Sequence, residues 1–146
     1  MTNAKSWKPA GAGEITIDSA AEESVCRKDR GTVYQMRDPP RWLQFTNASG
    51  GKMQHYGERQ TAFRTAGDET VIGMTFQASD VQKPLAAVWR TAEKGNRVCF
   101  GPKAEDNYMK TMTGKKIQMA RKCGSHVVKA DFVMEEVFGR PTTRTM

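Results

Sequence analysis

The sequence lacks the features that mark secreted and membrane-spanning proteins. It has no long apolar run, and its first residues, MTNAKSWKPAGAG, include no hydrophobic segment of the kind that directs secretion. It has only three cysteines, Cys26, Cys99 and Cys123, and no two of them are closely spaced, which argues against a disulfide framework and a zinc site. We therefore expect an intracellular, cytoplasmic protein with reduced thiols and no membrane contact.

Motifs for cofactor and metal chemistry are missing too. No glycine-rich phosphate loop precedes a helical pattern, so a nucleotide enzyme is not indicated. His55 and His126 have no Cys, Asp or Glu at metal-ligand spacing, and we expect both to be structural or surface residues. The sequence predicts no cofactor and no metal.

Apolar residues are scarce, at 38% of a chain of 146 residues. This length fits one domain that folds without disulfides, but its core is modest. Such composition is typical of a chain that completes its core by pairing with a partner, so we expect an oligomer.

Short strand patterns run along most of the chain and are separated by glycine-centred turns. They favour an all-β protein, a small barrel or sandwich, with at most one or two short helices. The expected strands are 14–17, 42–46, 61–65, 70–77, 85–89, 97–100, 116–120 and 126–133. We further expect 107–133 to form an antiparallel meander with turns at Thr113-Gly114 and Cys123-Gly124.

One acidic residue stands at an unusual place. The apolar stretch Ile15-Thr16-Ile17 leads directly to Asp18, and small residues follow it. Acids are more common in solvated turns, where Asp caps the local backbone. A strand that ends in Asp, a hydroxyl residue and small residues is also how aspartic peptidases place a catalytic carboxylate.

The order of three segments resembles the retropepsin-like proteases of retrotransposon polyproteins. Residues 15–25 are similar to the signature hydrophobic-x-hydrophobic-Asp-Ser/Thr-Gly-Ala-x-x-x-hydrophobic, with Ala20 where glycine is usual. Residues 45–63 resemble the family's glycine-tipped hairpin and the apolar-Gly step after it. Residues 74–88 resemble the stretch that ends in an apolar-apolar-Gly triplet, with Ala87 in place of the glycine.

The resemblance implies a closed β-barrel of retropepsin type and a homodimer in which two copies of Asp18 activate a water to cleave a peptide or polyprotein substrate. The implied catalytic residue is Asp18, supported in its loop by Ser19, Ala20 and Ala21. The loop beneath the pair would be Leu85, Ala86 and Ala87, and the flap over the substrate Ser49, Gly50, Gly51 and Lys52. The implied division is a flexible amino terminus (1–12), the retropepsin-like domain (13–101), an additional β-meander on the same domain (102–138) and a flexible tail (139–146).

Two other functions stay open at this stage. The altered glycines are compatible with a retropepsin-like fold that is inactive or serves as a binding module. The charge of +7 is concentrated towards the carboxy terminus, and Lys103, Lys110, Lys115, Lys116, Arg121, Lys122 and Lys129 occur near Tyr108. A basic β-domain of this kind could bind nucleic acid instead.

Overall fold

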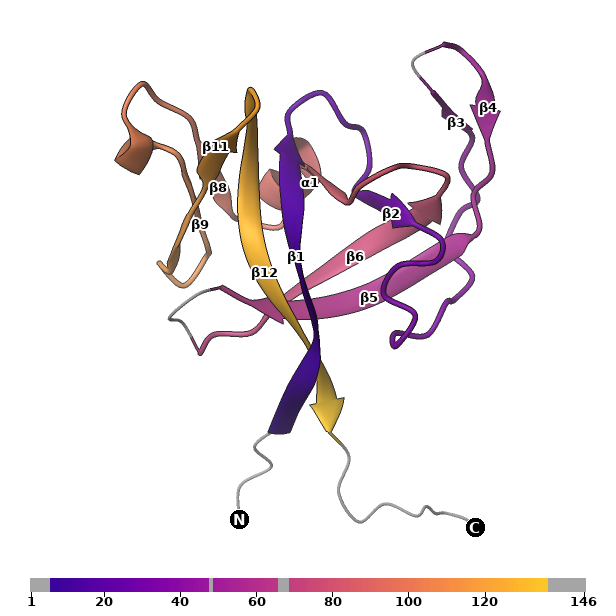
Figure 1. The fold of residues 1–146 in the computed structure, drawn as a ribbon, viewed down its shortest axis with the longest axis horizontal. Helices are drawn as coiled ribbons and strands as arrows, with labels where there is room; N and C mark the ends of the chain where they lie inside the picture. Colours follow the sequence, from indigo (N-terminus) through magenta and orange to yellow (C-terminus); the bar gives the residue numbers. More distant parts are fainter. Residues whose placement is uncertain (1–5, 48, 66–68, 137–146) are drawn as a thin grey trace.

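Six strands close into a barrel in the computed structural model, which describes residues 6–47, 49–65 and 69–136 (Figure 1). In order around the barrel they are β1 (Ser6–Asp18), β7 (Leu85–Ala87), β2 (Val25–Arg27), β6 (Ile72–Ser79), β5 (Gly57–Arg64) and β12 (Ser125–Glu136). The barrel closes because β12 pairs with both β5 and β1. The predicted all-β fold with a small closed barrel is confirmed.

The remaining elements lie around this barrel. A three-stranded sheet contains β8 (Arg97–Cys99), β9 (Tyr108–Lys110) and β10 (Lys116–Gln118), and β11 (Ala120–Lys122) extends the barrel sheet beside β12. A separate hairpin consists of β3 (Phe45–Thr46) and β4 (Lys52–Met53). Helical structure in the described residues is limited to α1 (Val88–Glu93) and the 3-10 turn η1 (Ala104–Asp106). No helix there is long and apolar enough to cross a membrane.

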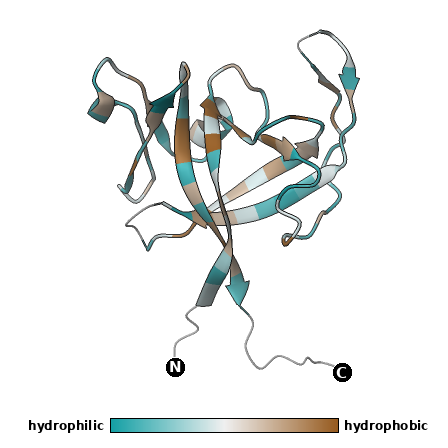
Figure 2. Cartoon of the chain, viewed as in Figure 1, coloured by the Kyte–Doolittle hydropathy of each residue, from teal (hydrophilic) through white to brown (hydrophobic). Residues whose placement is uncertain are grey.

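The core forms where β1 and β12 run side by side through the barrel. Ile15 pairs with Val128, and both side chains are almost fully buried. Phe63 and Phe76, each 2% exposed, come from β5 and β6 on the other side of the same cluster. Figure 2 shows the apolar bands on the halves of β1 and β12 that lie in the barrel and paler or hydrophilic colours towards their outer ends. Burial of these side chains is the main force holding the barrel closed.

The amino-terminal segment differs from the sequence-based prediction. Residues 6–12, expected to be loose, are the first half of β1 and pair with the last residues of β12, from Ser6 with Glu136 onward. The pairing shifts by one residue between Pro9 and Gly11, a β-bulge that admits the proline. Backbone hydrogen bonds between the outer halves of β1 and β12 hold this segment as a strand. The alternation of apolar and polar side chains along the sequence therefore does not predict the strand. Residues 1–5 and the expected tail, 139–146, lie outside the described residues.

The expected domain boundary after residue 101 is wrong as well. β12 is one of the six barrel strands, so the carboxy-terminal part of the chain completes the barrel instead of being added to it. The expected antiparallel strands are present with their turns, but Met119 divides the middle one: β10 pairs with β9, and β11 pairs with β12. Met119 is 3% exposed, and its burial turns the chain from one sheet into the other.

Candidate active site

Asp18 is the last residue of β1, at the end of a strand that is buried in the barrel. It lies beside Ala87 in the parallel pairing of β1 with β7. The Asp18 carboxylate accepts a hydrogen bond of 2.9 Å from the backbone N–H of Ala20, which shapes the turn after the strand. The structure therefore brings the predicted acid together with its loop, Ser19 to Ala21, and with Leu85 to Ala87.

The loop after Asp18 is tied to β7 and α1 by two hydrogen bonds and one ion pair. The buried Ser24 hydroxyl accepts a hydrogen bond of 3.0 Å from the backbone N–H of Ala87. The indole N–H of Trp89 donates to the carbonyl of Glu22 over 2.6 Å. Arg90 forms a two-point ion pair with Glu23, with distances of 2.6 and 3.2 Å. These bonds fix Glu22, Glu23 and Ser24, the second half of the loop. The backbone that follows Asp18 is therefore held in place against β7 and α1.

The two alanines that replace usual glycines are accommodated. Among the described residues, Cys123 is the one non-glycine residue with a positive φ, so Ala20 needs no left-handed backbone. Ala87 has φ −74° and is fully buried. A methyl group at either position is therefore compatible with this backbone.

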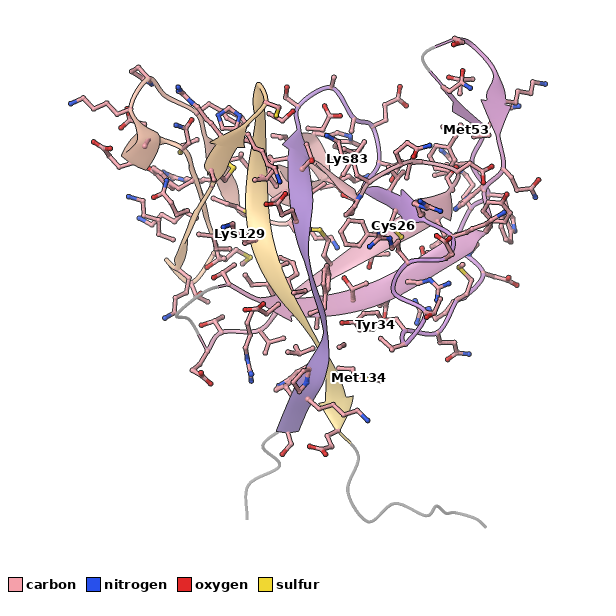
Figure 3. The ribbon with its side chains drawn as sticks, viewed as in Figure 1. Cys26, Tyr34, Met53, Lys83, Lys129 and Met134 are labelled. Atoms are coloured by element: carbon pink, nitrogen blue, oxygen red, sulfur yellow. The ribbon has the colours of Figure 1, made fainter. Side chains whose placement is uncertain are left out.

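Asp18 lines an open cavity of about 560 Å³ between the end of β1 and the β11–β12 turn. Lys83, labelled in Figure 3 beside the upper end of β1, and His126 lie on its walls. Its lining consists of Thr16, Ile17, Asp18, Ser19, Lys83, Leu85, Phe100, Gly124, Ser125 and His126. Among these residues Asp18 is the one acid, so a single copy of the described chain supplies one carboxylate to this cavity.

The hydrogen-bonding role of His126 follows from its neighbours. Its Nε2 lies 3.1 Å from Oδ1 of Asn107, an oxygen that already accepts a hydrogen bond from the backbone N–H of Gly101. The Asn107 oxygen is therefore an acceptor, and Nε2 of His126 carries a hydrogen. The ring of Phe100 packs against the imidazole at 4.7 Å between centroids. His126 thus forms a fixed wall of the Asp18 cavity.

The predicted flap is a hairpin that stands off the barrel on the same end as the loop after β1 (Figure 1). In its tip, the Asn47 side chain accepts hydrogen bonds from the backbone N–H groups of Ser49 and Gly51, and Gly50 has φ +84°. Lys52 begins its second strand. None of these tip residues is among the residues that line the Asp18 cavity.

His55 anchors the base of this hairpin to the barrel. Its Nδ1 accepts a hydrogen bond of 2.9 Å from the backbone N–H of Leu43, and its Nε2 lies 2.8 Å from Oε1 of Gln77. Gln77 in turn donates to the buried carboxylate of Glu58, which pairs with Arg37. These polar contacts fix the base of the hairpin against the barrel. The tip of the hairpin stands away from the barrel (Figure 1).

A larger cavity, of about 630 Å³, lies away from Asp18. Glu23, Ser24 and Arg90 contribute to its lining, so this cavity lies next to the bonds that hold the loop after Asp18. Asp18 is not among the described residues that line it, and we assign it no chemical role.

Several residues around the site were not anticipated from the sequence. Ser24, Arg90, Lys83 and His126 lie far apart along the chain or carry no local motif. Arg90, which neutralises Glu23, is 67 residues away along the chain, so sequence spacing does not identify this pair. Comparisons with protein-family models, curated proteins and solved structures found no match to this chain.

Proposed function

We propose that this protein is an aspartic endopeptidase of retropepsin type that acts as a homodimer. The observation that carries the proposal is the placement of Asp18: it ends a barrel strand, lies beside Ala87 in parallel pairing, and belongs to a loop that is bonded to β7 and α1. A carboxylate on a rigid backbone at an open cavity suits acid-base chemistry, because catalytic groups must be held within narrow tolerances.

The homodimer follows from what the reaction requires. Peptide hydrolysis of this kind uses two carboxylates that share one proton: one accepts a proton from the attacking water, and the other donates a proton to the peptide carbonyl oxygen. Asp18 is the one acid among the described residues of its cavity. The second carboxylate is therefore Asp18 of a second copy, related to the first by twofold symmetry. Two carboxylates at such close range repel each other when both are ionised, so the pair would hold one shared proton.

The substrate is an extended peptide segment, such as one in a polyprotein. In the part of the chain that the structure describes, β3 and β4 pair only with each other, and the hairpin has a glycine-containing tip. This hairpin would cover the substrate. An extended peptide binds such a surface by adding a strand, with its backbone providing affinity and its alternate side chains providing selectivity.

The deciding experiment compares Asp18→Asn with the wild-type chain in cleavage of a peptide library at about pH 5 and at about pH 7. Asn preserves the size of the side chain but cannot accept the proton from water, so cleavage is lost while folding is retained. Asp38→Asn, at an exposed position away from the site, is the matched control and retains activity. A statine-type transition-state mimic should inhibit the wild-type chain.

Absence of cleavage by the wild-type chain at both pH values, together with no cleavage by Ala20→Gly, would contradict the proposal. The inactive retropepsin-like fold would then be the better description. Ala20 is the appropriate position for this control because it is exposed, whereas the fully buried Ala87 would leave a cavity when replaced by glycine.

A further inference from the structure

The sheet of β8, β9 and β10 has two chemically different faces. Val98, Met109 and Ile117 are in register across its three strands and pack into or against the hydrophobic core. Met109 and Ile117 are 4% and 3% exposed. Because side chains alternate along a strand, the residues on either side of these three point away from the core.

The outward face carries a row of three positive charges. Arg97, Lys110 and Lys116 are directly opposite one another in the pairing of the three strands, and all are exposed. Tyr108 lies on the same face, two residues from Lys110, and the Lys116 ammonium is 4.2 Å from the centre of its ring. We call Arg97, Lys110, Lys116 and Tyr108 the cationic face.

This row is unfavourable for the folded chain by itself. Like charges directly opposite one another on neighbouring strands destabilise a sheet. None of the three cations has an ion-pair partner among the described residues. The cations cannot turn away, because the other side of the sheet is buried. Two other basic residues near this sheet are already engaged: Lys122 pairs with Glu14, and Arg121 donates to the carbonyl of Gly101.

We propose that the cationic face binds single-stranded nucleic acid, with phosphates on the three cations and a base stacked on Tyr108. A row of positive charges next to an aromatic ring on an open sheet is the combination that such ligands use, since every base offers a flat face and every nucleotide a phosphate. The Lys116 ammonium occupies the position over the ring that the base takes on binding. An acidic peptide would contact the charges but not use the ring, and the four residues of the cationic face include no aliphatic apolar side chain that could insert into an anionic bilayer. The inference does not depend on peptidase activity.

The test measures anisotropy of a fluorescein-labelled oligouridylate of about 20 nucleotides with the full chain, from about 50 to about 200 mM salt. Three phosphate contacts predict a slope of log K against log salt of about −2, because each contact on a single strand contributes about −0.7. The triple variant Arg97→Gln, Lys110→Gln and Lys116→Gln should bind at least about tenfold more weakly and lose most of this slope. Its thermal stability should be unchanged or higher, since the repulsion is removed.

A second triple variant is the matched control for net charge. Lys8→Gln, Arg30→Gln and Arg41→Gln remove the same three charges at exposed positions with no ion-pair partner among the described residues, and we expect a change of less than about twofold. Tyr108→Ala should weaken binding by about fivefold or more, whereas Tyr108→Phe, which keeps the ring, should not.

The proposal is overturned if both triple variants lose affinity equally, since binding would then follow net charge alone. It is also overturned if polyglutamate of matched length or vesicles containing phosphatidylserine bind the cationic face more tightly than the oligouridylate does. Asp18→Asn should bind like the wild-type chain, so a failure of the peptidase proposal leaves this result unchanged.

Discussion

At the scale of single residues, Cys26 couples folding to pH. Its thiol is buried in the barrel core, and burial raises its pKa from 9.0 to about 11. In the unfolded chain the thiol ionises at the lower value, so between about pH 9 and 11 the unfolded state has lost a proton that the folded state retains. Stability therefore falls with rising pH across this window, by a total of about 2 to 3 kcal/mol.

Urea unfolding of the wild-type chain and of Cys26→Ala, at about pH 8 and about pH 10.5, measures this contribution. The variant has no thiol to ionise, so its stability should fall less between the two pH values. Cys123→Ala is the control, because Cys123 is exposed and should leave the wild-type pH dependence intact. Identical pH dependence in all three chains would show that burial of Cys26 does not control this loss.

At the scale of elements, the link between the loop after Asp18 and β7 depends on a hydroxyl. Ser24→Ala removes the acceptor of the Ala87 N–H, which is fully buried and then has no partner. We expect a loss of about 1 to 3 kcal/mol in the free energy of unfolding, measured by urea denaturation. Ser19→Ala, in the exposed part of the same loop, should change stability by less than about 0.5 kcal/mol. Equal effects of the two substitutions would contradict the importance of this bond.

At the scale of the whole molecule, the peptidase proposal predicts that one defective copy inactivates its partner. Each dimer needs two Asp18 carboxylates, so an excess of the Asp18→Asn chain should suppress cleavage by a fixed amount of wild-type chain. Added Asp38→Asn chain should instead increase cleavage, because it forms active dimers. Independence of wild-type activity from added Asp18→Asn chain would rule out a site shared between copies, and sedimentation measures the dimers directly.

The all-β fold class and the position of Asp18 at the end of a strand could be predicted from the sequence, because both depend on neighbours along the chain. The alternation Ile15-Thr16-Ile17 identifies a buried strand, and the Cys123-Gly124 turn, with φ of 51° and 79°, has the chemistry that a tight hairpin requires. The expectation that residues 85–87 lie near Asp18 came from a short resemblance, and the structure pairs Asp18 with Ala87.

Which strands pair depends on contacts between distant segments and could not be predicted from local patterns. Val25–Arg27 is too short to be identified by alternation, yet it joins β7 to β6 in the barrel. Residues 6–12 become a strand because the end of β12 runs beside them, and the ion pair of Glu23 with Arg90 joins segments 67 residues apart. The sequence shows that the carboxy-terminal part is basic. It does not show that Arg97, Lys110 and Lys116 lie opposite one another, because that depends on the register of β8, β9 and β10. Local patterns determine what each segment can form, whereas backbone pairing between distant segments determines which side chains meet.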